Sequence, residues 1–499
     1  MTNPHQPRTV AFGNFVDGRS VPAIDDATFT SVNPTTGQEW ARFALSTSPD
    51  VDAAVDSGLR AWRTAWRDMV PSERGRLLTA WGALIAQEAE TIGETESVQN
   101  GKVVAELVAQ VTASEGYLRY YGGLADKVEG SVIPVPQQSV LNYTLREPLG
   151  VIAVILPWNS PTFHTVMAIS PALAAGNTVV IKPSEVTSAS AVRLAELALE
   201  AGIPPGVVNV VTGLRECGQA LVDHPGIAKI SFIGSVPAGR AVGAAAGRRL
   251  VTSTLELGGK SANIVFDDAD VDLAEQGIVA GIFAAAGQTC IAGSRAYVHR
   301  SLYDTMVNRL VKRANDIVVG DPLAAGTQMG PAATADQLAK NEQMVAAALD
   351  GGAELLTGGH RVDIAGLAGG FFFAPTILHN ATADNVVMRE EVFGPVLTIS
   401  PFDDVDEVAE NANATPYGLA AGVWTRDVRR AHLMARRLDA GTVWINTYRS
   451  LAYNSPFGGF KDSGTGRNNG VEAMNHFLQT KSVWCELGTE PLNPFVIRV

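Results

Sequence analysis

The chain has few cysteines, no excess of positive charge and no long apolar run, and each of these features excludes a class of protein. Its 499 residues include only three cysteines, Cys217, Cys290 and Cys485. Three thiols at unrelated spacings form neither a disulfide framework nor a metal site of the zinc type, which indicates a reducing compartment. The formal net charge of −13 argues against nucleic acid as the main partner, because phosphate binding requires an excess of lysine and arginine.

Targeting and membrane-spanning patterns are also missing from the sequence. The opening stretch, MTNPHQPRTVAFGNF, has no apolar core of the kind found in secretory signals. The longest apolar runs, such as VIAVIL at 151–156, are far shorter than the roughly 18 residues needed to span a bilayer. We therefore expect a cytoplasmic protein that binds neither nucleic acid nor a membrane.

Length and composition indicate a globular enzyme with more than one domain. A chain of 499 residues exceeds what one hydrophobic core usually organises, so we expect two or three domains. Hydrophobic residues make up 46% of the sequence and charged residues 18%, which excludes disordered and fibrous classes.

The first half of the chain alternates strand and helix patterns. A hairpin is expected around Asp17 and Gly18, and helical periodicity covers residues 48–65 and 72–127. Further on, continuous β-branched runs predict strands buried on both faces, separated by helical stretches such as 189–202. These runs occupy residues 151–156, 177–184, 206–213 and 227–235. Their alternation with helices predicts a doubly wound α/β domain.

A second α/β set follows from about residue 257, with patterns at 261–270, 294–317 and 441–446. Residues 130–150 and 479–487 fit neither set and have strand patterns that need an edge partner. We expect them to pair with each other and with another subunit; packing on their own domain is the alternative. The predicted bounds are 1–129 with 149–256 for the first domain, 257–462 for the second, and 130–148 with 463–499 for bridging segments.

Two segments at strand ends have residues suited to bind a dinucleotide. Gly234 and Gly239 follow a strand and open a helix, where free N–H groups favour a pyrophosphate. The spacing is not the usual G-x-G-x-x-G, and a plain strand–turn–helix explains it as well. Lys182 ends a buried strand, and Glu185 can accept bonds from two ribose hydroxyls. A carboxylate there repels a 2′-phosphate and favours NAD over NADP; a solvated lysine and a helix-capping glutamate are the alternative.

Glu256 and Cys290 are the residues best suited to chemistry. Glu256 lies between Leu255 and Leu257, and a carboxyl in apolar surroundings has a raised pKa that suits a general base. The alternative is a strand-edge glutamate that faces solvent. Cys290 lies in AAAGQTCIAGS, whose small side chains leave a nucleophilic thiol open to a substrate. An unpaired cysteine is, however, more often a small core residue.

Together these motifs and their order resemble the aldehyde dehydrogenase superfamily, from about residue 15 to 490. The resemblance is carried by PWNSP (157–161), KPSE (182–185), FIGSVPAG (232–239), LELGGKS (255–261), AAGQTCIAGSR (285–295), EEVFGPV (390–396) and SPFGGFKDSG (455–464). It implies an α/β fold with a Rossmann-like NAD domain, a second α/β catalytic domain and a small β oligomerisation arm. It also implies NAD as cofactor, with NADP less favoured, an aldehyde substrate, and a homodimer or homotetramer.

The resemblance also implies the site residues. Cys290 would form a thiohemiacetal and then a thioester, Asn159 and the Cys290 N–H would hold the oxyanion, and Glu256 would activate the hydrolytic water. Lys182 is implied both in catalysis and in cofactor binding. The implied cofactor-binding residues are Leu156, Pro157, Trp158, Lys182, Ser184, Glu185, Gly234, Ser235, Gly239, Leu257, Glu391 and Phe393.

The substrate pocket is expected after Asn159 and before the SPFGG motif. The residues that the resemblance places there are Phe163, His164, Met167, Thr289, Ile291, Arg449, Leu451, Tyr453 and Phe457. An aromatic, methionine-bearing lining suits an apolar or aromatic aldehyde. Arg449 can instead bind the carboxylate of a semialdehyde or form a surface salt bridge, and both readings stay open. We expect His164 to be a packed polar residue rather than a catalyst.

Two departures from the family pattern leave the implied catalytic residues intact. Ala285 stands where the family often has Asn, and Asn468 stands where it often has Glu. Three other functions are less consistent with the sequence. Transfer of the acyl group to CoA is disfavoured by Glu256, a non-catalytic structural role by the intact catalytic set, and reduction of an activated acid by the lack of a G-x-x-x-x-G-K-[ST] motif.

Overall fold

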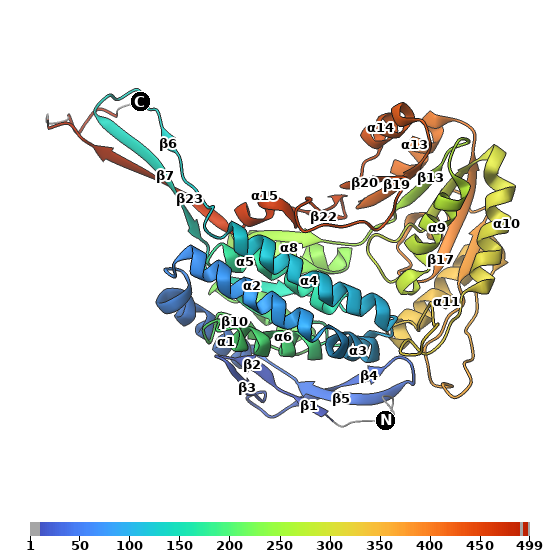
Figure 1. Cartoon of the computed structure of the whole chain (residues 1–499), viewed down its shortest axis with the longest axis horizontal. Coiled ribbons are helices and arrows are strands. Elements are labelled where there is room, and N and C mark those ends of the chain that lie inside the picture. The colour runs from blue at the N-terminus through green and yellow to red at the C-terminus, as the bar shows by residue number, and fades with distance from the viewer. Residues whose placement is uncertain (1–9, 490–492, 498–499) are drawn as a thin grey trace.

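The computed structural model describes residues 10–489 and 493–497, which form three parts (Figure 1). One α/β unit is coloured blue to green, a second is coloured mainly yellow to orange, and a narrow arm extends away from the first. The predicted fold class, with two α/β units and a small β arm, is confirmed.

The first unit is built around an eight-stranded sheet in the order β22-β12-β11-β8-β9-β10-β2-β3. Its central strands are mutually parallel and include all four predicted β-branched runs. Asp17 and Gly18, with φ of 54° and 72°, form the turn of the predicted hairpin. The strands are β2 (Asn14–Val16), β3 (Arg19–Val21), β8 (Val151–Ile155), β9 (Thr178–Lys182), β10 (Val208–Val210), β11 (Ile227–Ile233), β12 (Thr252–Glu256) and β22 (Gly464–Thr465).

Helices cover both faces of this sheet, because successive strand side chains point to opposite sides. In β8, Ile152 and Val154 pack with α2, α4, α5 and α6, whereas Val151 and Ala153 pack with α1, α7 and α8. The helices are α1 (Ser48–Ala61), α2 (Pro71–Gln87), α3 (Ala89–Asn100), α4 (Val104–Leu124), α5 (Pro161–Ala174), α6 (Ala189–Glu200), α7 (Arg215–Asp223) and α8 (Val236–Arg249).

The helical pattern predicted over 72–127 is divided into α2, α3 and α4. Gly101 ends α3 in a left-handed conformation with φ of 74°, which a side chain would strain. Residues 48–65 continue from α1 into a short π-helical turn, Trp62–Trp66. A three-stranded sheet that the sequence patterns did not predict comprises β1 (Val10–Phe12), β5 (Gln38–Ala44) and β4 (Thr28–Asn33).

A seven-stranded sheet in the order β15-β16-β17-β14-β13-β19-β20 organises the second unit. All its neighbouring strands are parallel except the edge pair β15 and β16. Its strands are β13 (Ala262–Val265), β14 (Arg295–His299), β15 (Glu354–Thr357), β16 (Thr376–His379), β17 (Val396–Phe402), β19 (Ala420–Trp424) and β20 (Thr442–Ile445). Its helices are α9 (Val271–Ile282), α10 (Arg300–Asp316), α11 (Ala335–Asp350), α12 (Val386–Arg389), α13 (Val405–Asn413) and α14 (Val428–Arg437). A separate antiparallel pair consists of β18 (Tyr417–Gly418) and β21 (Phe460–Lys461).

The arm is a three-stranded antiparallel sheet of β6 (Val132–Ile133), β7 (Val140–Pro148) and β23 (Leu478–Glu486) (Figure 1). The register runs from Leu478 opposite Pro148 to Glu486 opposite Val140, so the two unassigned segments pair as predicted. The early part of the predicted bridging segment 463–499 does not belong to the arm but packs on the first unit. Strand β22 pairs with β12, and α15 (Gly470–Asn475) packs on α5, because Ala473 and Met474 are apolar and buried in the first core.

Candidate active site

Cys290 follows a tight turn that precedes β14. Ala285, Ala286 and Gly287 all have positive φ, at 55°, 53° and 70°. Alanine is strained in this region, and such strain persists where the surrounding structure enforces it. A Cβ on Gly287 would lie 2.0 Å from Gly394 O, so only glycine allows this approach. The turn leaves the Cys290 side chain half-buried rather than inside the core.

The Cys290 thiol lies in surroundings that disfavour its ionised form. Burial raises the pKa of Cys290 to about 12, and the carboxyls of Glu391 and Glu256 add to this effect. The thiol is therefore protonated at neutral pH in the free chain. A nucleophilic thiolate requires either a base or additional positive charge when a substrate is bound.

Glu256 is the last residue of β12, at the edge where the parallel strands end. Its side chain is buried, and neither carboxyl oxygen has a hydrogen-bond partner within the part of the chain that the structure describes. Burial raises the pKa of Glu256 well above its ordinary value, and Arg467 only partly offsets this. A carboxyl with a raised pKa is a stronger base, once ionised, than an ordinary glutamate, which suits a general base.

Asn159 lies between β8 and α5, and its side chain faces the cysteine turn. Its Nδ2 donates to Gln288 O at 3.0 Å. Gln288 is held in turn, because its Oε1 accepts from Ala333 N at 2.8 Å and its Nε2 donates to Pro331 O at 3.3 Å. An amide has two N–H groups, so one remains for a ligand next to Cys290.

A cavity of about 480 Å³ opens at the carboxyl ends of β8, β9, β11 and β12. It is where an open α/β sheet binds its ligand, and α8 begins at its wall. The residues predicted to bind cofactor that line it are Leu156, Pro157, Trp158, Lys182, Ser184, Glu185, Gly234, Ser235, Leu257, Glu391 and Phe393. Gly239 lies behind the wall, where a Cβ would meet Leu257 Cδ2 at 2.4 Å, so this glycine lets α8 approach the sheet.

Charged groups lie at both ends of this cavity. Lys182 Nζ lies 3.9 Å from Glu185 Oε2, and burial lowers the pKa of Lys182. At the other end, Glu391 Oε1 accepts from Gly259 N at 3.0 Å, and burial raises the pKa of Glu391 to about 7. A Cβ on Gly258 would lie 2.2 Å from Glu391 Oε2, so the absence of a side chain at Gly258 leaves room for this carboxyl.

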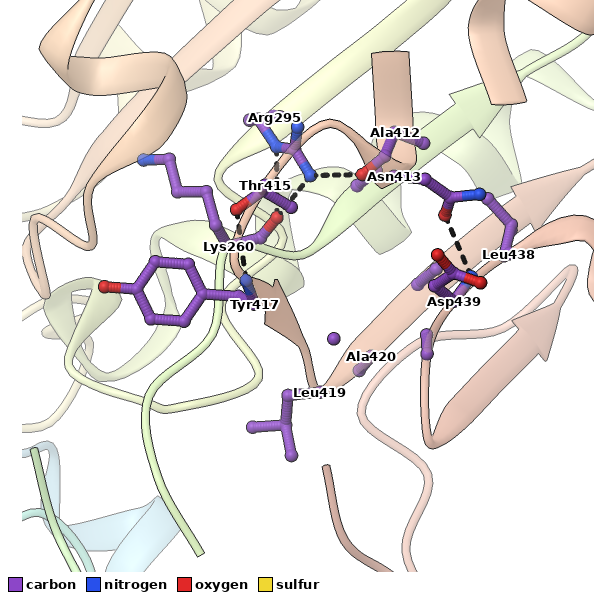
Figure 2. Close-up of a pocket in the computed structure, with 14 residues that line it drawn as sticks. Lys260, Arg295, Ala412, Asn413, Thr415, Tyr417, Leu419, Ala420, Leu438 and Asp439 are labelled. Carbon is purple, nitrogen blue, oxygen red and sulfur yellow. Dashed lines mark hydrogen bonds between the residues drawn. The ribbon is translucent and has the colours of Figure 1, made fainter. Parts of the chain in front are cut away.

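A buried arginine fixes the turn that follows this glycine pair (Figure 2). Arg295 Nη2 donates to Lys260 O at 2.6 Å and to Ala412 O at 2.8 Å. Burial, together with the Arg295 charge, lowers the pKa of Lys260 to about 7. The adjacent cavity measures about 20 Å³, enough for about one water molecule, so this cluster supports the larger cavity rather than binding a substrate.

A second cavity, of about 520 Å³, shares Cys290 and His164 with the first. The wall comes from α4, α5, the cysteine turn and the loop after β20. It brings together all nine residues predicted for the substrate pocket: Phe163, His164, Met167, Thr289, Ile291, Arg449, Leu451, Tyr453 and Phe457. Tyr117 packs edge-on against both Phe163 and Tyr453, with ring centroids 5.3 Å and 5.9 Å apart.

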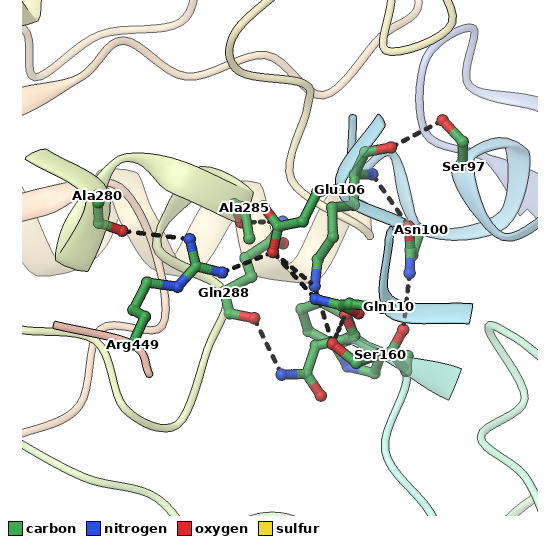
Figure 3. A network of polar contacts seen from close by, with 12 residues as sticks. Ser97, Asn100, Glu106, Gln110, Ser160, Ala280, Ala285, Gln288 and Arg449 are labelled. Carbon is green, nitrogen blue, oxygen red and sulfur yellow. Dashed lines mark hydrogen bonds and ion pairs between the residues drawn. The ribbon is translucent and has the colours of Figure 1, made fainter. Parts of the chain in front are cut away.

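The sequence left the role of Arg449 in this wall open and predicted that His164 is a packed polar residue. Arg449 forms a largely buried ion pair, with Nη2 2.6 Å from Glu106 Oε1, instead of an exposed one (Figure 3). His164 is packed in the wall, and burial lowers the pKa of His164 to about 3. The imidazole is therefore neutral at physiological pH.

Cys290 lines both the cavity at the sheet edge and the second cavity, and His164 is the other predicted residue that does so. The sequence missed most of the α4 wall, because no motif marks it: Gln110, Thr112, Ala113, Glu115, Gly116, Tyr117 and Arg119. It also missed Ile155, Arg215, Gly218, Phe232, Ile233, Ala238, Gly258, Gln337 and Lys340 in the first cavity, and Ser160 and Ala452 in the second. Of these, Phe232, Ile233, Ala238, Gly258 and Ser160 were within quoted motifs, whereas Gln337 and Lys340 come from a helix without one.

Comparisons with known proteins agree with this architecture. The family described as the aldehyde dehydrogenase family matches residues 21–483. The phenylacetaldehyde dehydrogenase of Pseudomonas fluorescens is 43% identical over 477 residues, 94% of each chain. The (Z)-2-((N-methylformamido)methylene)-5-hydroxybutyrolactone dehydrogenase of Acinetobacter baylyi is 41% identical over 490 residues, 97% of this chain and 98% of that one. The NAD+ complex of an aldehyde dehydrogenase from Bacillus cereus has a TM-score of 0.93 at 39% identity, covering 96% of this chain and 97% of that one.

Matches of this extent define the chain as an oxidoreductase of the α/β class. It belongs to the aldehyde dehydrogenase family, which confirms the predicted enzyme class, NAD-dependent aldehyde dehydrogenase. Within residues 10–489 and 493–497, no helix is long and apolar enough to cross a membrane. The same residues contain no cluster of three or more His, Cys, Asp or Glu side chains arranged to hold a metal ion.

Proposed function

We propose that this chain oxidises an apolar or aromatic aldehyde to the carboxylic acid, with NAD+ as the hydride acceptor. The observation that carries the proposal is the position of Cys290, whose side chain lines both the cavity at the sheet edge and the aromatic cavity. A nucleophile shared by two cavities can hold a substrate carbon on one side while a hydride acceptor occupies the other.

Each polar residue near Cys290 fits one step of this reaction. The Cys290 thiol releases its proton to water, the thiolate adds to the aldehyde carbon, and the Asn159 amide and the Cys290 N–H hold the resulting oxyanion. Bound NAD+ accepts the hydride, which leaves a thioester on Cys290. Glu256, whose pKa is raised by burial, takes a proton from the water that hydrolyses the thioester.

The cavity at the sheet edge suits a dinucleotide. Its volume of about 480 Å³, the start of α8 and the carboxylates of Glu185 and Glu391 in its lining suit a ligand with a pyrophosphate and two riboses. In this proposal Lys182 and Glu185 bind the adenosine ribose, Ser235 lies at the pyrophosphate, and Glu391 binds the nicotinamide ribose. Trp158 and Phe393, with ring centroids 5.3 Å apart, flank the bound cofactor.

Replacing Glu185 with serine is expected to improve the use of NADP by roughly tenfold relative to NAD. The Glu185 carboxylate repels a 2′-phosphate, and serine removes the charge while keeping a hydroxyl. The measurement is the ratio of kcat/KM for the two cofactors, together with their Kd values from quenching of tryptophan fluorescence. Glu196→Ser, on the outer side of α6, is the matched control, and an unchanged ratio in Glu185→Ser assigns ribose recognition to another residue.

The aromatic cavity suits an uncharged substrate. Tyr117, Phe163, Tyr453 and Phe457 supply apolar surface, and the nearby guanidinium of Arg449 is already paired with Glu106. A semialdehyde that binds through Arg449 is the second candidate, because Arg449 lines this cavity. The pairing with Glu106 favours the apolar or aromatic aldehyde.

Replacing Gly116 with alanine is expected to lower kcat/KM for aromatic aldehydes by about fivefold, with an effect under twofold on acetaldehyde. A Cβ on Gly116 would lie 3.0 Å from Tyr453 Cε1, so the ring must shift, and overpacking by a methyl group costs about 1 kcal/mol. Gly123→Ala is the matched control, because it lies on the same helix and its Cβ would meet nothing within 4 Å. Equal effects of both substitutions would show that helix stability, not cavity shape, is responsible.

We infer that the first unit binds NAD, that the second unit supplies the nucleophile, and that the arm joins subunits. Leucine and tryptophan side chains are exposed on the arm, including Leu141, Leu145 and Trp484, with exposed fractions of 39%, 42% and 59%. Leu141 and Leu145 lie on the middle strand β7 and Trp484 on the edge strand β23, and exposed apolar side chains on such a sheet favour contact with a second copy of the chain. We therefore propose a homodimer or a homotetramer. The mass of the assembly, measured by sedimentation, distinguishes the two.

The test of the proposed substrate is the initial rate of NADH formation at a panel of aldehydes. The panel contains short and long aliphatic, terpenoid, benzaldehyde-type and carboxylate-bearing aldehydes, each also assayed with NADP. We expect the apolar and aromatic members to give the highest kcat/KM. A preference for the carboxylate-bearing members would favour the second candidate and assign the carboxylate to Arg449.

A further inference from the structure

The arginine in the wall of the aromatic cavity is held by a carboxylate from another element. Arg449 Nη2 donates to Glu106 Oε1 at 2.6 Å, and its Nη1 donates to Ala280 O at 3.3 Å. Figure 3 shows the guanidinium between these two partners. The exposed fractions of the Arg449 and Glu106 side chains are 21% and 23%, so water screens this pair far less than a surface pair.

Glu106 has further donors around the same oxygen. Gln110 Nε2 donates to Glu106 Oε1 at 3.1 Å, and Lys102 Nζ lies 3.6 Å from it. Lys102 Nζ also donates to Ser160 Oγ at 2.9 Å, next to the start of α5. Burial raises the pKa of Glu106, but Lys102 and Arg449 together bring it below its ordinary value. The carboxyl is therefore ionised at neutral pH and stays paired.

The backbone at Arg449 is consistent with a side chain fixed from outside the cavity. Its φ is 61°, a conformation in which a residue other than glycine is strained. Glu106 on α4 and Ala280 on α9 hold the side chain from two elements. The direction of the guanidinium is thus set without a ligand in the cavity.

We propose that Glu106 is a specificity-determining residue, which keeps the Arg449 guanidinium paired and thereby excludes aldehydes that bear a terminal carboxylate. A substrate carboxylate at this wall would have to compete with Glu106 for the Arg449 guanidinium. It would also be repelled by the negative charge of Glu106 itself. Selectivity of this kind comes from disfavouring the wrong ligand rather than from added contacts with the right one. The inference rests on the proposed oxidation of apolar aldehydes in the same cavity.

The experiment compares the wild type with Glu106→Gln on heptanal and adipic semialdehyde, which present a methyl and a carboxylate at the end of chains of similar length. Glutamine keeps an acceptor for Arg449 and removes the negative charge. The kcat/KM ratio of the semialdehyde to heptanal is expected to rise by about tenfold or more, mainly through a lower KM, because a charge-assisted hydrogen bond to the substrate becomes available. An unchanged ratio in a folded variant would overturn the proposal.

Two companion variants separate this effect from a general loosening of the cavity. Glu106→Gln combined with Arg449→Met should lose the gain, because the guanidinium that would bind the carboxylate is absent. Arg449→Met alone should lower the same ratio below that of the wild type, because the wall loses one positive charge while Glu106, with Lys102 as its remaining partner, keeps its negative charge. This single variant also tests the proposal if Glu106→Gln does not fold, and a ratio at or above the wild-type value would overturn it.

The same data distinguish failure of this inference from failure of the proposed function. If the wild type already prefers adipic semialdehyde to heptanal, the proposed substrate class is wrong and Glu106 excludes nothing. If the wild type prefers heptanal and Glu106→Gln leaves the ratio unchanged, the substrate class stands and the role of Glu106 is wrong.

Discussion

Replacing Cys290 with alanine is expected to reduce aldehyde oxidation at least about a thousandfold, because no other described side chain with a thiol lines either cavity. Binding of NAD+ should change little, since alanine keeps the backbone of the turn and removes one sulfur atom at the end of a large cavity. The measurements are steady-state NADH formation and titration of NAD+ by tryptophan fluorescence.

The matched control for this variant is Cys485→Ala. Cys485 is exposed on the arm and lines neither cavity, so Cys485→Ala should retain full activity. Residual turnover above a few per cent in Cys290→Ala would assign the nucleophile to another group. Loss of NAD+ binding together with activity would instead indicate that the turn had collapsed.

Replacing Glu256 with glutamine is expected to slow steady-state turnover by about 100- to 1,000-fold while leaving a first burst of NADH, one equivalent per active site. Glutamine cannot take a proton from water, so the thioester accumulates after hydride transfer. Rapid-mixing absorbance measurements separate the two phases. Disappearance of the burst would show that Glu256 acts before hydride transfer.

The pH dependence of the wild type supplies an independent readout for Glu256. Its pKa is raised by burial, so the active, ionised form gains population as the pH rises, and deacylation should accelerate with pH. This dependence should be absent from Glu256→Gln. The folded chain also holds the proton more tightly than the unfolded chain does, so stability falls as the pH rises above the ordinary pKa of a glutamate. The glutamine variant should therefore have a higher Tm at neutral pH.

The sequence predicted the central strands well, because they are continuous β-branched runs that only a sheet buried on both faces accommodates. For Glu256 it left two positions open, buried between leucines or facing solvent at a strand edge, and the structure shows the buried one. The helices were harder to delimit. Periodicity over 72–127 does not show that the chain turns at Gly101, because the turn depends on one left-handed residue rather than on the apolar pattern.

The parts of the site that could not be predicted are contacts between distant segments. Glu106 and Arg449 are 343 positions apart, and nothing in either local sequence indicates the partner. The sequence around Gly116 does not distinguish it from other helical glycines, and only the structure shows that Tyr453 packs against it. The same holds for α15, whose apolar residues pack on α5 instead of extending the arm.

The most direct test of the account is the mass of the covalent intermediate. Glu256→Gln is incubated with NAD+ and an apolar aldehyde, quenched in acid, digested and analysed by mass spectrometry. Because the thiol loses a proton and the aldehyde loses a hydride, the peptide that contains Cys290 should gain the mass of the aldehyde less two hydrogens. An acyl group on Cys217 or Cys485, or a burst of NADH with no adduct on Cys290, would contradict the account.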